Sequence, residues 1–161
     1  MTFHYHFSEI CYDLKNRLYV LGDVSNMDAH VVHQMQDVLE GGNADIIGRW
    51  VDLAVSEVAD QMSPLLTRVD AGDTPSDNLP HPVEEYVLQV DWPSLNLPSW
   101  KERLRLLIHE YVVVRVFALW LAMVSPGDVQ YWQMSAEQTL LQLKRFTFSR
   151  WKNIRLRVDP F

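Results

Sequence analysis

The sequence predicts a mainly α-helical protein: a helical bundle around a long central helix, with a short β-hairpin or arm and an extended C-terminal tail. Three observations indicate this class. Apolar residues recur at helical spacing through most of the chain, and one long apolar run lies within residues 99–124. Two short segments, residues 2–7 and 84–92, alternate with the period of two that is typical of strands. At 161 residues and 48% apolar, the chain is long enough to bury a core.

The central helix is expected over residues 99–124, because the residues at its two ends are typical of a helix start and a helix end. Ser99 is a good N-cap residue, and Glu102 three positions later completes a capping box. Pro126 and Gly127 then make continuation of the helix unfavourable. At about 1.5 Å per residue, this helix would be about 37 Å long, which is the diameter of a small domain.

From Tyr111 onward, apolar residues surround this helix on every side, and Arg115 is the only charge. Such a helix is either covered by neighbouring elements or placed in a membrane. The apolar run Tyr111–Val124 is shorter than the roughly 20 residues that a membrane span needs, and it contains an arginine. The sequence therefore predicts a buried central helix and no membrane association.

The remaining elements follow from periodicity and from helix-capping residues. Thr2–Phe7 is predicted as a strand with its aromatic side chains facing the protein. Four further helices are predicted: from Ser8 to Gly22, from Asn26 or Asp28 to Gly41-Gly42, from Asn43 to Ser63, and from Asp128 to about Lys144-Arg145. The last of these carries a seam for packing on a neighbour, made of Val129, Trp132, Ala136, Leu140 and Leu143.

Residues 63–98 are rich in proline and have an acidic, polar middle, which reads as an exposed loop. Two extended runs, Leu65–Val69 and Glu84–Trp92, flank this middle. We therefore expect a hairpin or β-arm that projects from the helical body. A long loop of this kind is often a contact element.

The net charge of −7 is unevenly distributed along the chain. Residues 1–100 carry 4 basic and 16 acidic side chains, whereas residues 101–161 carry 10 basic and 5 acidic ones. Such an asymmetry can orient copies head to tail or steer one end of the molecule onto an acidic partner. Alternatively, the two halves neutralise each other within one domain.

Cysteine usage and the N-terminus indicate a cytoplasmic site of synthesis. The single cysteine, Cys11, excludes an internal disulfide framework and fits a reducing compartment. The first ten residues, MTFHYHFSEI, lack the basic and apolar regions of a signal peptide.

No catalytic or metal-binding motif stands out. His4 and His6 share a strand face, and His30 and His33 share a helix face, and both spacings are compatible with metal ligation. A zinc site usually needs three or four ligands, however, and there is no His-Glu-x-x-His arrangement. There is also no nucleophile elbow and no glycine-rich phosphate loop. We therefore expect no enzyme activity, no cofactor and no metal.

Arg115 needs a partner, because an unpaired buried charge is very costly. One possibility is an ion pair with an acid of the third predicted helix, for which the candidates are Asp52, Glu57 and Asp60. The other is a contact with a second subunit, which would cover this apolar face.

The chain is expected to divide into a helical domain, residues 1–145, and a basic tail, residues 146–161. Ile154, Leu156 and Val158 alternate with arginines, so the end of the tail is predicted to be extended, like a strand that adds to a partner edge. Arginine and aromatic residues are enriched at protein interfaces. The predicted docking residues are Arg150, Trp151, Lys152, Ile154, Arg155, Leu156, Arg157 and Phe161. A nucleic-acid arm, with Phe146, Phe148 and Trp151 between the cations, and a solvated tail are the alternatives.

The order and length of these elements over residues 43–161 resemble the small helical head–tail connector proteins of tailed bacteriophages, also called adaptor or head-completion proteins. The shared features are an amphipathic helix over 43–62, a proline-rich β-arm, a long buried helix over 100–124, a shorter packing helix over 128–144 and a basic tail. The resemblance concerns pattern and includes no invariant motif. The strand and two helices before Gly42 go beyond the simplest members of that family.

The resemblance implies a non-enzymatic, structural role in the virion, after assembly in the host cytoplasm. Copies of the chain would form a ring, twelve in number by analogy, beneath the portal vertex. The C-terminal segment would dock onto the portal protein, and a tail protein or second connector would bind on the other side. DNA would pass through the channel without specific binding, which suits the acidic character of residues 1–100.

Overall fold

The computed structural model describes residues 1–24, 29–40, 43–63, 65–70, 83–90 and 98–155 of the chain. In chain order the elements are β1 (Thr2–His6), α1 (Phe7–Val24), α2 (Ala29–Gln36), α3 (Asn43–Met62), β2 (Leu66–Asp70), β3 (Glu85–Val90), α4 (Pro98–Val124), a 3₁₀ turn η1 (Pro126–Asp128) and α5 (Val129–Arg155). The protein is mainly helical with a small antiparallel sheet, which confirms the predicted fold class. The middle of the predicted arm, residues 71–82, lies outside the described residues.

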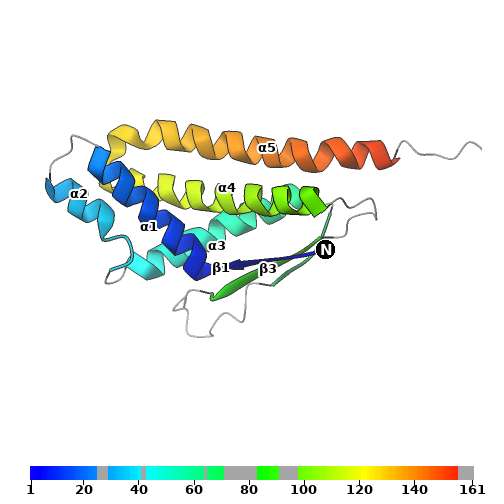
Figure 1. Cartoon of the computed structure of the whole chain (residues 1–161), viewed down its shortest axis with the longest axis horizontal. Coiled ribbons are helices and arrows are strands. Elements are labelled where there is room, and N and C mark those ends of the chain that lie inside the picture. Colours follow the sequence, from blue (N-terminus) through cyan, green and yellow to red (C-terminus); the bar gives the residue numbers. More distant parts are fainter. Residues whose placement is uncertain (25–28, 41–42, 64, 71–82, 91–97, 156–161) are drawn as a thin grey trace, which may run out of the picture.

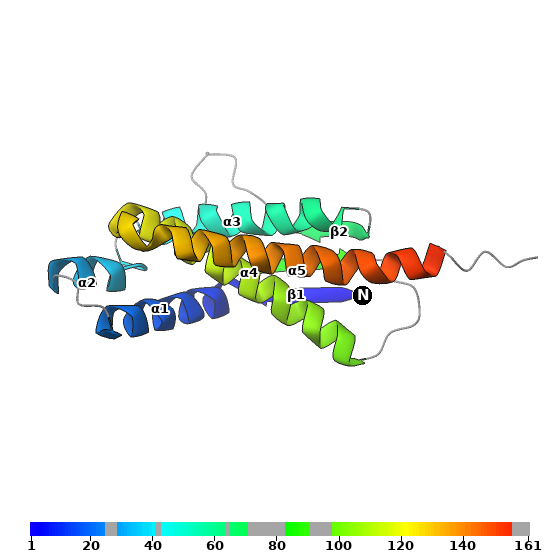
Figure 2. The same cartoon turned by 90° about the horizontal axis from the view of Figure 1, so that it is seen from above.

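Helix α4 is the centre of the molecule, as predicted. It packs against α1, α2, α3 and α5, and α5 covers it on one side (Figure 1) and crosses it obliquely (Figure 2). Leu104, Ile108 and most residues from Tyr111 to Leu121 are buried, because neighbouring helices cover several sides of α4. Viewed from above, α1 and α3 lie on opposite sides of the α4–α5 layer (Figure 2).

Among the described residues, the stretch Ser99–Val124 is long and apolar enough to cross a membrane by length and composition alone. The buried core helices of folded proteins can be equally long and apolar. In this fold 56% of the most apolar window of the helix is buried inside the protein, which agrees with the predicted core position.

The sheet has the strand order β1-β3-β2, and both pairings are antiparallel. The predicted hairpin corresponds to β2 and β3, and the aromatic N-terminal strand pairs with the other edge of β3. Phe3 lies opposite Leu88, and Tyr5 opposite Tyr86, and all four of these side chains are buried. The predicted alternation is therefore confirmed, with the aromatic face directed into the core.

Several helix boundaries differ from the prediction, and α1 spans Phe7–Val24 where a helix from Ser8 to Gly22 was expected. Helix α2 ends at Gln36, not at Gly41-Gly42, because the chain turns there: the Glu40 amide donates to the Asp37 carbonyl. Helix α4 starts at Pro98, so Ser99 lies inside its first turn. Proline is favoured at the first position of a helix, since its missing N–H has no intrahelical partner there. The Glu102 carboxylate, predicted to close a capping box, accepts hydrogen bonds from Arg105 at 2.8–3.2 Å.

Helix α5 is longer than predicted. It continues past Lys144-Arg145 to Arg155, so the expectation of an extended tail is wrong for residues 146–155. Neither proline nor glycine interrupts this stretch, and its lysine and two arginines are good helix formers. The predicted packing seam is confirmed: Val129, Ala136 and Leu143 are buried, and Trp132 and Leu140 are partly buried against the core.

Candidate functional site

The C-terminal half of α5 is the candidate docking element. Its base is attached to the body by Phe146, which stacks on Trp100 with ring centroids 5.1 Å apart. The Arg103 guanidinium lies over the Phe146 ring, 5.2 Å from its centroid. Next to it, Thr147 is buried and its hydroxyl donates to the Leu143 carbonyl at 2.9 Å. Two residues predicted to belong to the tail are therefore part of the packed body.

The structure describes five of the eight predicted docking residues, and it places these five in a helix. Arg150, Trp151, Lys152, Ile154 and Arg155 belong to the last turns of α5, where a strand was expected at Ile154 and Arg155. Leu156, Arg157 and Phe161 lie outside the described residues. The division into residues 1–145 and 146–161 remains a prediction as a functional boundary.

Arg115 forms the intrachain ion pair that was one of its two predicted roles. Of the three candidate acids, Glu57 of α3 is the partner: the Arg115 Nε and Nη2 donate to the two carboxylate oxygens at 3.0 and 2.9 Å. The Tyr111 hydroxyl donates to the same carboxylate. Both side chains of the pair are about 28–29% exposed, so the pair lies at the edge of the core.

The electrostatics of this group follow from its geometry. Burial alone would raise the pKa of Glu57, but the hydrogen bonds from Arg115 and Tyr111 lower it below its ordinary value. The hydrogen bond to Glu57 in turn raises the pKa of Arg115. The guanidinium and the carboxylate therefore stay ionised together, and the pair ties α4 to α3.

The first histidine pair shares one carboxylate. His4 Nδ1 lies 3.0 Å and His6 Nε2 3.8 Å from the same oxygen of Glu85 on the neighbouring strand. His30 and His33 are exposed on α2. Across the described residues, no three or more His, Cys, Asp or Glu side chains come together in a way that could hold a metal ion.

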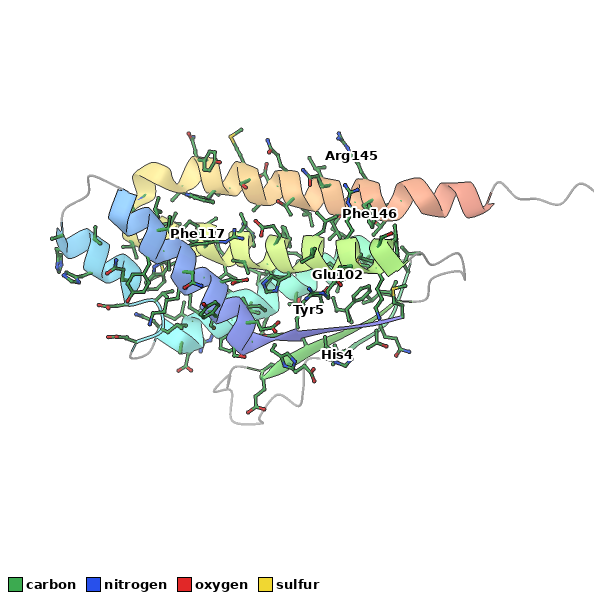
Figure 3. The ribbon with its side chains drawn as sticks, in the orientation of Figure 1. His4, Tyr5, Glu102, Phe117, Arg145 and Phe146 are labelled. Carbon is green, nitrogen blue, oxygen red and sulfur yellow. The ribbon has the colours of Figure 1, made fainter. Side chains whose placement is uncertain are left out.

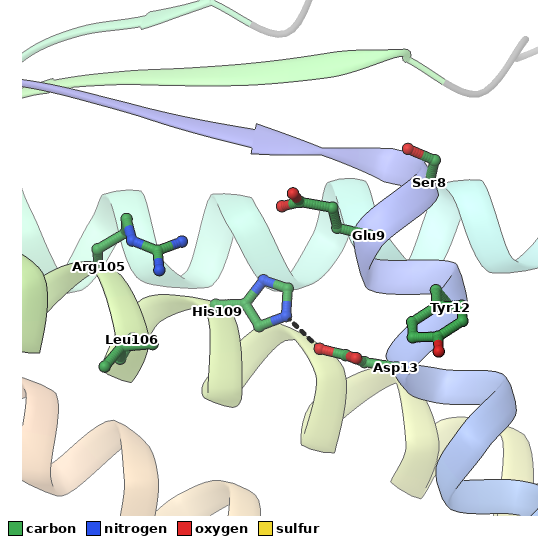
Figure 4. Close-up of a pocket in the computed structure, with 7 residues that line it drawn as sticks. All are labelled: Ser8, Glu9, Tyr12, Asp13, Arg105, Leu106 and His109. Carbon is green, nitrogen blue, oxygen red and sulfur yellow. Dashed lines mark hydrogen bonds and ion pairs between the residues drawn. The ribbon is translucent and has the colours of Figure 1, made fainter.

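Sequence reasoning missed a hollow of about 430 Å³ between α1 and α4 (Figure 4). It is lined by Ser8, Glu9, Tyr12, Asp13, Arg105, Leu106 and His109. His109 Nε2 lies 2.8 Å from an oxygen of Asp13. The sequence signal was the polar stripe Lys101, Arg105 and His109 on α4, but nothing in it pointed to Asp13.

A histidine–carboxylate pair is also part of catalytic triads. The chemistry open to this pair therefore depends on the surroundings of the second ring nitrogen of His109, Nδ1. His109 Nδ1 is closed off from solvent and has no hydrogen-bond partner among the described residues. A general base must reach the proton that it abstracts. The contact of His109 Nε2 with Asp13 joins α1 to α4.

Taken together, the fold and these groups define a mainly helical protein that is organised around a buried helix, with a small antiparallel sheet and a long C-terminal helix. No protein family, no curated protein and no solved structure matches the chain.

Proposed function

We propose that this protein is a non-enzymatic structural protein of a virion, a head–tail connector that docks to the portal protein through the C-terminal end of α5. One observation supports this proposal above the others. Helix α5 extends beyond the start of α4 and beyond the described sheet, so that its last turns project from the body (Figures 1 and 2).

A projecting helix with a fixed base is well suited to docking. Phe146 and Thr147 hold α5 against the body, and the helix continues from there to Arg155. Because this backbone is already ordered, binding costs less conformational entropy than it would for a flexible tail. The sequence places Arg150, Lys152 and Arg155 on these turns, and arginine is enriched at interfaces.

The assembly proposed for the virion follows from the resemblance to connector proteins and from the charge distribution. Copies would form a ring, twelve by analogy, between the portal and a tail protein or second connector. Residues 1–100 carry 16 acidic and 4 basic side chains. A ring surface built from this part of the chain repels the DNA backbone, so that DNA would pass without being held.

The docking proposal is tested by a chain that ends at Phe148, which keeps the contacts of Phe146 and Thr147. We expect full-length protein to co-sediment with purified candidate portal rings, and the 1–148 chain to lose at least about tenfold in affinity, or about 1.4 kcal/mol. The double variant Arg150→Gln/Lys152→Gln should also weaken binding. Lys15→Gln/Lys101→Gln removes two positive charges from exposed positions elsewhere and is the matched control.

Equal portal binding by the 1–148 chain and the full-length protein, with both chains folded by circular dichroism, would show that the docking proposal is wrong. The alternative function, a monomeric module that binds nucleic acid with the same basic end, predicts a different result. In that case full-length protein binds duplex DNA without any portal, the affinity falls steeply with salt concentration, and the 1–148 chain does not bind.

A further inference from the structure

Helix α5 carries a second apolar stripe on the side that faces away from α4. Tyr131, Met134 and Leu141 are 69%, 58% and 52% exposed. The buried seam includes Val129, Ala136, Leu143 and Thr147. At about 100° per residue, the exposed stripe lies on the opposite side of α5 from this seam. Figure 3 shows Arg145, which belongs to the exposed side, pointing away from the body.

The spacing of this outer stripe is that of a coiled-coil seam. Its members are Tyr131, Met134, Gln138, Leu141, Arg145 and Phe148, which follow one another at intervals of three and four residues. This is the a and d pattern of a heptad repeat, in which each side chain inserts between residues of a facing helix. The pattern favours a helix as the occupant. A polar residue at an a position, such as Gln138, is a known device for fixing register.

We propose that the outer stripe of α5 binds the same stripe of a second copy of this chain, with the two helices antiparallel. Centred between Gln138 and Leu141, this register sets Tyr131 against the second copy's Phe148. Gln138 then faces Leu141, and Met134 faces the aliphatic stem of Arg145, whose charged end reaches water. The two-fold axis repeats each contact, so the surface is complementary to itself.

Charge complementarity selects both the occupant and the direction. Glu137 and Lys144 are exposed at equivalent g positions beside the stripe. Residues at g positions flank the seam and form ion pairs between helices. In the antiparallel register Glu137 faces Lys144 of the second copy, and symmetry gives two such pairs. A parallel pair would instead bring the two Arg145 side chains together and would leave Glu137 opposite Gln142.

This pairing goes beyond the proposed docking function and does not depend on it. It uses residues 131–148, whereas the proposed docking turns follow Phe148, and the antiparallel arrangement leaves one such end free on each side of the pair. A two-fold contact cannot by itself close a cyclic ring. The pair therefore describes the free protein, and ring formation would require a further contact through another surface of the chain.

Sedimentation velocity over a hundredfold range of protein concentration tests the pairing. We expect a reversible shift from the 18.8 kDa chain to twice that mass. Leu141→Glu should raise the dimer dissociation constant at least tenfold. Leu106→Glu is the matched control, because Leu106 is also 52% exposed but lies on α4. A monomer at every concentration, or equal effects of the two variants, would overturn the proposal.

Charge reversal tests the direction and the identity of the occupant. Glu137→Lys and Lys144→Glu should each dimerise poorly alone, because each places like charges opposite one another. Mixed together they should form a heterodimer with affinity near that of the wild type, and the double variant should also recover self-association. Failure of the mixture and of the double variant to recover would refute the antiparallel register. Thermal unfolding of each single variant would establish that it is folded.

Discussion

Arg115 illustrates at the residue scale how one polar side chain is accommodated in an apolar helix. Its guanidinium meets the Glu57 carboxylate through two hydrogen bonds, and Tyr111 donates to the same acid. Breaking one partner of such a group leaves an incompletely paired charge, which costs more than the pair itself contributes. The group therefore matters most when it is disrupted from one side only.

The pH dependence of stability should report on this group. Because the folded protein holds the pKa of Glu57 below its ordinary value of 4.5, the pair contributes stability above about pH 4.5. That contribution is lost as the pH falls through the folded-state pKa. We expect Glu57→Gln to lower the free energy of unfolding by about 1–3 kcal/mol at neutral pH. The difference in unfolding free energy between this variant and the wild type should narrow at about pH 3.

Urea unfolding followed by tryptophan fluorescence at several pH values measures this gap. Asp60→Asn changes an exposed carboxyl one turn further along α3, and it should alter stability by less than about 0.5 kcal/mol. If the stability difference between Glu57→Gln and the wild type stays constant from neutral pH to pH 3, the Glu57–Arg115 pair is not the source of this pH dependence.

At the scale of elements, α5 has three tasks along its length. Its inner seam packs on α4, its outer stripe is the proposed contact with a second copy, and its projecting end is the proposed docking element. Phe146 links these tasks, because its stack on Trp100 decides where the packed part of the helix gives way to the projecting part.

Phe146→Ala should loosen the C-terminal half of α5 without unfolding the body. We expect a loss of about 1–3 kcal/mol, less than for a fully buried phenylalanine, since Phe146 is only partly buried. Hydrogen exchange should show faster exchange of amides from about Leu143 onward, with the N-terminal half of α5 unchanged. Uniform loss of protection throughout the molecule would argue against a local role.

At the scale of the whole molecule, stability depends on α4, which contacts four other helices. Phe117 lies in the C-terminal half of α4 and is fully buried, with its ring centroid 4.5 Å from that of Trp132. The helices around α4 all pack on this core, so a substitution here should lower the stability of the whole protein.

Phe117→Ala is therefore expected to lower the free energy of unfolding by about 3–5 kcal/mol, a large part of the 5–15 kcal/mol typical of a domain. Met123→Ala removes an apolar side chain that is 57% exposed on the same helix, and it should cost less than about 0.5 kcal/mol. Chemical denaturation of both variants checks the contrast. Similar losses for the two would mean that α4 is not the common core.

The sequence by itself determined the order of the helices and strands, most of their extents and which of their faces are buried. The reason is that the spacing of apolar residues reflects which face of each separate element is buried, as the seam of α5 and the aromatic side of β1 show. The long apolar helix at the centre was likewise readable from its composition.

Only the tertiary structure decided which distant side chains meet. Asp52, Glu57 and Asp60 were equal candidates for Arg115 until α3 and α4 were packed, and the His109–Asp13 pair joins residues 96 positions apart. The stack of Phe146 on Trp100 was likewise decided only by the tertiary structure, because the sequence had assigned residue 146 to the tail. Periodicity is a local property, whereas pairing depends on how whole elements are placed in space.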